Sequence, residues 1–159
     1  MNINEIKIME NIQKLNITQL MILFSKPFNT IGFTITIISL YVYNILTFND
    51  VVFIYSGSLF SLIIKLFFKR ERPYNFSKNI RNLSGKTHLT IFNKYSFPSG
   101  HTFSATIFSL IMLKKFPKEF VFNIIPVLVG FSRIFLGVHY PSDIIGGMIF
   151  GFVYYNLLK

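Results

Sequence analysis

Long runs of apolar residues separated by short polar stretches are the dominant pattern along the chain. Runs that approach 20 residues are typical of helices that cross a membrane. Residues 31–47 carry no charged side chain and would form a helix of about 25 Å. Four further runs follow, at residues 51–68, 101–113, 121–136 and 141–158. The pattern predicts an all-α integral membrane bundle with five transmembrane helices, or six if the N-terminal segment also crosses.

The N-terminal segment has a different pattern. In residues 3–24, apolar side chains recur at intervals of three or four, with charged side chains between them. This periodicity predicts an amphipathic helix on the membrane surface, while a crossing by residues 8–24 stays open as the alternative. We therefore divide the chain into an N-terminal amphipathic helix, residues 1–27, and a transmembrane domain, residues 28–159.

Composition agrees with a membrane protein and narrows its partners. The chain has 159 residues, of which 52% are hydrophobic, and a formal net charge of +10. Its cations are interleaved with the apolar runs, which disfavours nucleic acid and favours lipid headgroups or an anionic substrate. The chain has no cysteine, so it has no disulfide framework. It also lacks the pattern of a cleaved signal peptide, so we expect the first span to direct insertion.

Unusual residues gather at one side of the predicted membrane. If each apolar run crosses once, successive polar connections alternate between the two sides. Three stretches then meet on the same side: residues 65–73, 98–101 and 132–143. This count of crossings assumes no function.

The first stretch is "KLFFKRERP". Lys65 and Arg72 are seven residues apart, which on a helix places them on one face two turns apart. Pro73 is expected to end that helix. Lys65 lies inside an apolar run, where charged residues are usually functional. Lys69 and Arg70 are interpreted as ordinary cations at a helix end.

The second stretch is "PSGH". A helix that begins here would present free backbone N–H groups and the positive end of its dipole, which suits a phosphate. Ser99 adds a hydroxyl donor, and Gly100 lets the backbone approach closely. His101 can then give a proton to a leaving oxygen. Taken alone, His101 is also compatible with an interfacial histidine.

The third stretch is "SRIFLGVHYPSD". Arg133 is a charge inside an apolar run. Asp143 follows His139 by four residues, in the first turn of a helix opened by Pro141. A carboxylate there can accept the Nδ1–H bond and leave Nε2 as a nucleophile. Taken singly, Asp143 suits a first-turn acid and His139 an interfacial histidine.

Together the three stretches resemble the motifs of the type 2 phosphatidic acid phosphatases, a family that shares its fold with vanadium haloperoxidases. The family pattern is Lys-x6-Arg-Pro, then Pro-Ser-Gly-His, then Ser-Arg-x5-His-x3-Asp. Residues 65–73, 98–101 and 132–143 match every motif position in the same order. The resemblance covers roughly residues 28–158, and His88 matches no motif.

The resemblance implies a role for each motif residue. His139 is expected to attack phosphorus and form a phosphohistidine, Asp143 to hold its tautomer, and His101 to act as general acid. The remaining residues are expected to neutralise the phosphoryl oxygens, and they are Lys65, Arg72, Arg133, Ser99 and Gly100. No metal or other cofactor is implied, because the cations supply the charge.

The resemblance therefore implies a membrane lipid phosphatase similar to the small bacterial members of the family. Candidate substrates are undecaprenyl diphosphate, phosphatidylglycerol phosphate, phosphatidic acid and phosphorylated lipid A. The alternatives are a phosphotransferase of the same fold and a non-enzymatic membrane scaffold. The family implies a multi-pass cell-membrane protein with an extracytoplasmic site, whereas the cation-rich loop at residues 69–97 alone favours the cytoplasm.

Overall fold

The computed structural model describes residues 3–85 and 94–159, and every regular element in that part is a helix. The prediction of an all-α fold is confirmed. In chain order the helices are α1 (Ile3–Ile12), α2 (Thr18–Ser25), the 3-10 helix η1 (Lys26–Phe28), α3 (Thr30–Val42), α4 (Phe48–Phe68), α5 (Pro73–Phe76), α6 (Gly100–Lys115), α7 (Val121–Phe135) and α8 (Pro141–Leu158).

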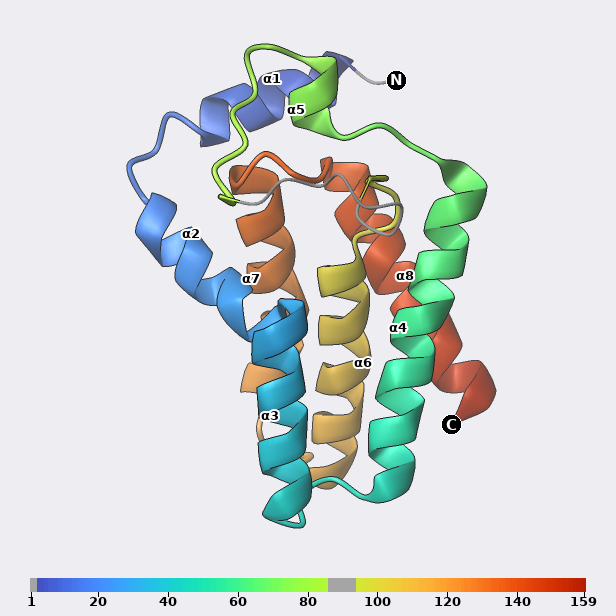
Figure 1. The fold of residues 1–159 in the computed structure, drawn as a ribbon. Helices are drawn as coiled ribbons and strands as arrows, with labels where there is room; N and C mark the ends of the chain where they lie inside the picture. The colour runs from blue at the N-terminus through green and yellow to red at the C-terminus, as the bar shows by residue number, and fades with distance from the viewer. Residues whose placement is uncertain (1–2, 86–93) are drawn as a thin grey trace.

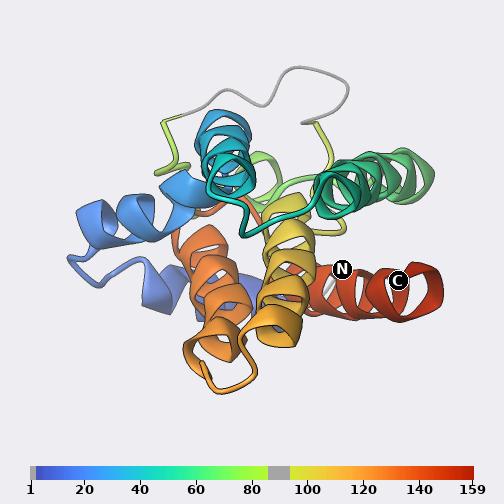
Figure 2. The ribbon, with the colours of Figure 1, turned by 90° about the horizontal axis from the view of Figure 1, so that it is seen from below.

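Helix α6 forms the centre of the bundle, with α3, α4, α7 and α8 arranged around it (Figures 1 and 2). Its side chains Phe103 and Ile107 are fully buried, in a core that includes Ile37 of α3 and Ile54 of α4. A central helix has no face left for water or lipid, which explains why α6 is buried on most sides.

Two glycines let α8 approach α6 closely. A methyl group on Gly147 would lie 2.7 Å from the carbonyl oxygen of Ser99, and one on Gly151 would lie 3.0 Å from that of Phe103. Small residues at such positions allow the close approach of helices that is typical of membrane bundles. Because Ser99 begins α6, this contact sets the height of α8 against the start of α6.

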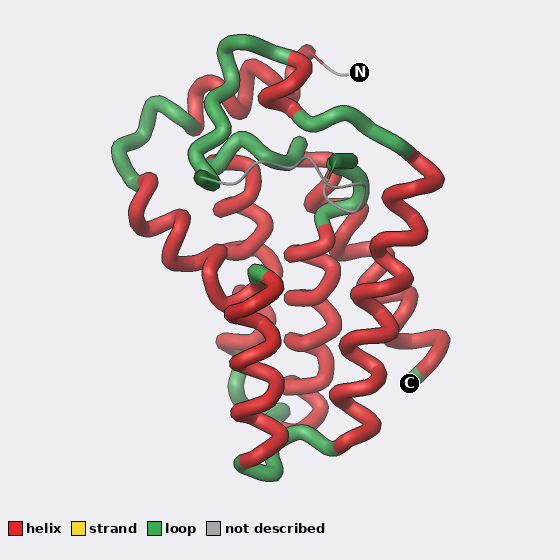
Figure 3. Tube along the Cα trace, viewed as in Figure 1, coloured by secondary structure: helices red, strands yellow, loops and turns green. Residues whose placement is uncertain are grey.

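The N-terminal segment is not the single helix predicted for residues 3–24. It forms α1 and α2, with a break at residues 13–17 (Figure 3). At the break, the Gln13 amide donates to the carbonyl oxygens of Arg81 at 2.8 Å and Phe135 at 2.9 Å. These partners are distant in sequence, so the local apolar period gave no sign of them. Helix α1 consequently lies across the end of the bundle (Figure 1).

The start of α4 also differs from the prediction. The apolar run begins at residue 51, but residues 48–50 already form the first turn of the helix. The hydroxyl of Thr47 accepts from the backbone N–H of Asp50, and the Asp50 carboxylate accepts from that of Thr47. This capping box starts the helix three residues before the apolar run does. Helix α3 is correspondingly shorter than predicted and ends at Val42.

The end of α4 lies before Arg72. The helix stops at Phe68, because Lys69 adopts a left-handed conformation with φ of 48°. Pro73 does not end α4 but opens the short helix α5. The prediction that Lys65 and Arg72 share one face of a single helix is therefore wrong.

The described part of the chain has one segment that is long and apolar enough to cross a membrane, Phe48–Phe76. A second is present only if Thr18–Phe28 and Thr30–Val42, which meet at 54°, count as one span. Helix α7 is apolar but shorter. By length and hydropathy, the structure thus offers fewer clear spans than the five or six predicted.

Candidate active site

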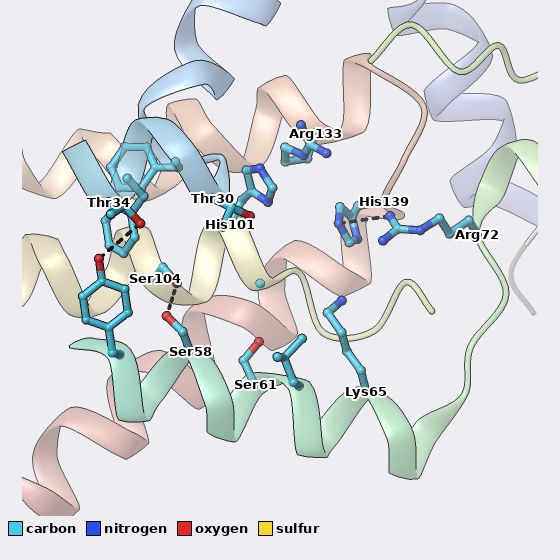
Figure 4. Close-up of a pocket in the computed structure, with 15 residues that line it drawn as sticks. Thr30, Thr34, Ser58, Ser61, Lys65, Arg72, His101, Ser104, Arg133 and His139 are labelled. Carbon is cyan, nitrogen blue, oxygen red and sulfur yellow. Dashed lines mark hydrogen bonds between the residues drawn. The ribbon is translucent and has the colours of Figure 1, made fainter. Parts of the chain in front are cut away.

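Six of the eight expected site residues line one pocket of about 260 Å³ (Figure 4). The pocket begins between the ends of α4, α6 and α7 and the connection that leads into α8. The six are Lys65, Arg72, Gly100, His101, Arg133 and His139. Residues from all three stretches, which the count of membrane crossings placed on one side, therefore line one cavity.

The other two expected residues, Ser99 and Asp143, lie behind this wall. Ser99 is fully buried and is the N-cap of α6, where its hydroxyl accepts from the backbone N–H of Thr102 at 3.4 Å. The predicted helix start is confirmed, but the Ser99 hydroxyl serves the helix and does not line the pocket. Asp143 contacts His139 on the side of the ring that faces away from Arg72.

His139 is held between a cation and a carboxylate. Its Nε2 lies 3.4 Å from Nη1 of Arg72, and its Nδ1 lies 3.4 Å from Oδ2 of Asp143. The same carboxylate oxygen accepts from the backbone N–H of Tyr140 at 2.9 Å. Asp143 is thereby fixed as the acceptor for Nδ1–H, which leaves Nε2 as the nitrogen with a lone pair. Figure 4 shows His139 and Arg72 side by side.

The backbone before His139 needs a glycine. Gly137 has φ of 76°, in the left-handed region, and a methyl group there would collide with the carbonyl oxygen of Arg81. This turn reverses the chain after α7 and brings His139 back over the pocket. Sequence reasoning did not single out Gly137.

The surroundings of His139 keep its imidazole neutral. Burial lowers the pKa of His139 well below its ordinary value of 6.5, and the charges of Arg72, Lys65 and Arg133 lower it further. A buried ring surrounded by cations binds a proton poorly. At neutral pH, Nε2 is therefore available to attack an electrophile.

The cations of the pocket donate to neutral acceptors. Lys65 Nζ donates to the carbonyl oxygens of Pro98 at 2.6 Å and Ser96 at 3.2 Å. Arg72 donates to the carbonyl oxygen of Val138 at 2.7 Å, and Arg133 donates to the hydroxyl of Ser25 at 2.5 Å. The buried Arg133 Nε has no hydrogen-bond partner among the described residues. These contacts position the cations without cancelling their charge, so the pocket suits an anion.

Arg70, which sequence reasoning took for an ordinary helix-end cation, belongs to this site. One nitrogen of its guanidinium donates to Asp143 Oδ1 at 2.7 Å and to the Ser142 hydroxyl at 2.6 Å. The guanidinium also stacks on the ring of Tyr140 at 4.0 Å. Arg70 therefore holds the carboxylate oxygen that His139 does not contact.

Helix α1 completes this arrangement through Glu5. Its carboxylate accepts from Arg70 at 2.9 Å and from the backbone N–H of Ser142 at 2.8 Å. Burial raises the pKa of Glu5, but the bonds from Ser142 and Arg70 outweigh it, so the pKa lies below its ordinary value. No sequence signal linked Glu5 to the motifs, because its partners are distant in the chain.

Two further expectations concern a metal ion and His88. Within residues 3–85 and 94–159, no three or more His, Asp or Glu side chains gather as a metal ion would require. His88, interpreted as a loop histidine, lies outside the described residues.

The chain is similar to known proteins in both sequence and fold. A family model described as the PAP2 superfamily matches residues 46–159. The chain is 31% identical over 113 residues to phosphatidylglycerophosphatase B of Bacillus subtilis, covering 64% of this chain and 50% of that protein. It is 37% identical over 82 residues to an undecaprenyl-diphosphatase of Sulfolobus acidocaldarius, covering 50% of this chain and 37% of that protein.

The chain thus spans half or less of the length of these two relatives. Its fold is similar to the crystal structure of the transmembrane PAP2-type phosphatidylglycerolphosphate phosphatase from Bacillus subtilis. The TM-score is 0.72 at 21% sequence identity, over 95% of this chain and 82% of that one. At this identity the likeness concerns the fold alone.

Proposed function

Because the chain belongs to the PAP2 superfamily, we propose that it is a membrane lipid phosphatase that acts through a phosphohistidine intermediate. One observation carries the proposal: Nε2 of His139 faces Arg72, while Nδ1 faces Asp143. The nucleophilic nitrogen is therefore directed at the place where a phosphoryl group would bind.

The first chemical step is an in-line displacement. Nε2 of His139 attacks phosphorus and forms a P–N bond, while the bond from phosphorus to the lipid oxygen breaks. His101 gives a proton to that leaving oxygen. Lys65, Arg72 and Arg133 stabilise the charge that develops on the phosphoryl oxygens, and the N–H of Gly100 adds a neutral donor. Asp143 stabilises the positive charge of the phosphorylated ring.

The second step returns the enzyme to its starting state. A water molecule attacks phosphorus on the side away from His139, and His101 takes the proton of that water. The P–N bond breaks, and inorganic phosphate leaves with Nε2 again neutral. No step in this scheme needs a metal ion, because the three cations supply the positive charge.

We place the protein in the cell membrane as a multi-pass domain within residues 28–159, with helix α1 of the N-terminal segment across its end. Large apolar side chains on the outside of the bundle support this, among them Ile31 of α3, Phe67 of α4 and Phe152 of α8. Five helices then cross: α3, α4, α6, α7 and α8. The pocket opens on the extracytoplasmic side.

Phosphate release by the purified protein tests the proposed reaction. Wild type, His139→Ala and His88→Ala are compared in detergent, with EDTA and without added metal. Candidate substrates are phosphatidylglycerol phosphate, undecaprenyl diphosphate and phosphatidic acid. Release that survives EDTA, persists in His88→Ala and vanishes in His139→Ala is expected. Release unchanged in His139→Ala would remove this histidine as the nucleophile, and phosphate passed to an added lipid instead of water would identify a transferase.

Single-cysteine labelling tests the orientation, because the chain has no cysteine of its own. Lys78 lies at the pocket end and Lys118 at the opposite end, and both are exposed. We expect an impermeant thiol reagent to label Lys78→Cys in intact cells and to spare Lys118→Cys. The reverse result would place the pocket in the cytoplasm.

A further inference from the structure

Helix α1 is joined to the start of α8 by one buried carboxylate, that of Glu5, which is 8% exposed. Its Oε1 accepts from the backbone N–H of Ser142, in the first turn of α8, at 2.8 Å. Its Oε2 accepts from Arg70 at 2.9 Å. An acid is favourable there, because it meets free N–H groups and the positive end of the helix dipole. Figure 1 shows α1 lying across this end of the bundle.

Three contacts connect this carboxylate with the nucleophile. Glu5 bonds to Arg70, and Arg70 donates from its other terminal nitrogen to Asp143 Oδ1 at 2.7 Å. The second oxygen of Asp143 lies 3.4 Å from Nδ1 of His139. A planar guanidinium that is bonded to a carboxylate on each side has little freedom to rotate. The placement of Asp143 against His139 therefore depends on both bonds of Arg70.

The summed charge of this row also bears on the proposed intermediate. Glu5 and Asp143 each carry one negative charge and Arg70 carries one positive charge, so one negative charge remains. The phosphorylated ring of His139 is positive, and a negative group behind the ring stabilises it. Without Glu5, the guanidinium would offset the charge of Asp143. Glu5 thus keeps Asp143 effective although a cation is bonded to it.

The docking of α1 does not depend on Glu5 alone. The same helix buries Met9 in an apolar cluster with Tyr140. Beyond its end, the Gln13 amide donates to two backbone carbonyl oxygens of other segments. Because these contacts also hold the helix, a change of charge at residue 5 should alter the contact with Arg70 more than the position of α1.

We propose that Glu5 is a positioning residue for the phosphohistidine step, and that it acts on His139 through Arg70 and Asp143. The inference rests on the proposed function and adds a residue to its site. Glu5 lies outside residues 46–159, the part of the chain that matches the family model. It is not among the described residues that line the pocket. Its contribution therefore belongs to kcat and not to the binding of substrate.

Glu5→Gln in the full chain tests the proposal. The variant keeps the size of the side chain and an oxygen for the N–H of Ser142, but it removes the charge next to Arg70. We expect kcat for phosphate release to fall about 3- to 10-fold while KM stays within about twofold, since the geometry of the transition state is what changes. Glu5→Asp, which restores the charge on a shorter side chain, should recover part of the loss.

Glu10→Gln is the matched control. Glu10 lies on the same helix, and its carboxylate accepts from the Asn79 amide at 3.0 Å, in the connection that follows α5. The substitution therefore removes a charge that holds α1 to another segment, without touching Arg70. Both kcat and KM should stay within about twofold of wild type. An equal loss of kcat in Glu10→Gln and Glu5→Gln would overturn the proposal, because docking of α1 would then explain both.

A double-mutant cycle shows whether Glu5 acts through Arg70. In the Arg70→Gln background, Glu5→Gln should lower kcat by less than about twofold, because the contact between the two side chains is already lost. Equal losses in the two backgrounds would contradict the proposed route. A rise in KM at constant kcat would also overturn the proposal, since it would assign the effect of Glu5 to substrate binding.

The binding of two small anions separates this proposal from the proposed reaction. Orthovanadate adopts the five-coordinate geometry of an in-line displacement, whereas inorganic phosphate stays tetrahedral. Binding is measured as the rise in unfolding temperature with anion concentration. Glu5→Gln should weaken orthovanadate binding about 3- to 10-fold and leave phosphate binding unchanged, because contacts specific to the transition state depend on positioning.

The two failures are then distinct. If wild type releases no phosphate from any lipid but the difference in orthovanadate binding is present, the proposed reaction is wrong and the positioning role of Glu5 stands. If Glu5→Gln binds both anions as wild type does, the role of Glu5 is wrong, whether or not a lipid is hydrolysed.

Discussion

The two ends of the helical bundle hold their lysine side chains in different ways. At the end away from the pocket, the buried carboxylate of Asp50 pairs with Lys115 at 2.9 Å and also with Lys159. At the pocket end, Lys65 and Arg133 donate to neutral carbonyl and hydroxyl oxygens. The first cluster joins the start of α4 to the ends of α6 and α8, and its carboxylate offsets one of the two positive charges. The second keeps its charge directed at a cavity.

The comparison shows that the acceptor, and not the cation, separates a structural cluster from a binding site. Lysine occurs in both places, although Lys65 is buried whereas Lys115 and Lys159 are partly exposed. A carboxylate cancels the charge locally, whereas a carbonyl orients the ammonium group and leaves its attraction for an anion. Arg70 is intermediate, because it bonds to Asp143 beside the pocket and to Glu5 on α1.

Replacing Lys65 should lower the activity at the pocket end. Lys65→Met keeps the length of the side chain but removes its charge from the phosphoryl oxygens. We expect kcat/KM to fall about 100-fold or more, the size typical when one stabilising donor of a transition state is lost. Phosphate release and the unfolding temperature are measured together. The control is Lys69→Met, since Lys69 is exposed and does not line the pocket. Equal activity in the two variants would contradict the assignment.

Replacing Asp50 should lower the stability of the opposite end. Asp50→Asn leaves Lys115 and Lys159 close together without a counter-charge. The free energy of unfolding should fall by about 1–3 kcal/mol, while kcat for phosphate release stays within twofold of wild type. Chemical unfolding in detergent measures the first effect. Asn49→Ala, at the exposed neighbouring position, should change neither quantity. A large loss of kcat with no loss of stability would reverse the roles of the two ends.

Replacing Arg70 tests the role of the cation that bonds to a carboxylate beside the pocket. Arg70→Gln leaves one oxygen of Asp143 without its cation, so His139 is positioned less well. We expect kcat to fall about 10-fold with little change in KM, because the guanidinium holds Asp143 and not the substrate. Arg70→Lys should recover part of the loss, and Lys69→Gln should have no effect. A rise in KM at constant kcat would show instead that Arg70 contacts the substrate.

The pH dependence gives the smallest expected effect. Burial and nearby cations lower the pKa of His139 below 6.5, so the neutral nucleophile persists into mildly acidic solution. The acidic limb of kcat/KM should therefore lie below pH 6.5 once the ionisation of the substrate is corrected for. The groups that face this ring are Lys65 of α4, Arg72, His101 of α6, Arg133 of α7 and Asp143 of α8. A limb at or above 6.5 would contradict the effect of these cations.

The lowered pKa of His139 also makes the free energy of unfolding depend on pH. The unfolded chain binds a proton at His139 more readily than the folded protein does. The contribution of this histidine to stability is therefore fully present above pH 6.5 and is lost as the pH falls from that value toward the lower pKa of the folded protein. Measurement of the unfolding free energy of wild type and His139→Ala across this range isolates the contribution.

Local signals in the sequence determined the helical class, the family resemblance and most of the pocket. Ser99 before Gly100 and Pro141 before a glycine-containing apolar run mark helix starts that the structure confirms. Those signals depend on neighbours in the chain, as do the fixed spacings within each motif. The roles of the motif residues in catalysis stay predictions, which the variants above test.

Only the tertiary structure decided which groups beyond the motifs reach the site. Arg70 meets Asp143 across 73 positions of the chain, and Gln13 meets Phe135 across 122. The end of α4 at Phe68 and the break between α1 and α2 accompany such contacts. Hydrophobic period and motif spacing describe neighbours in the chain, whereas these features arise where distant segments satisfy each other's polar groups.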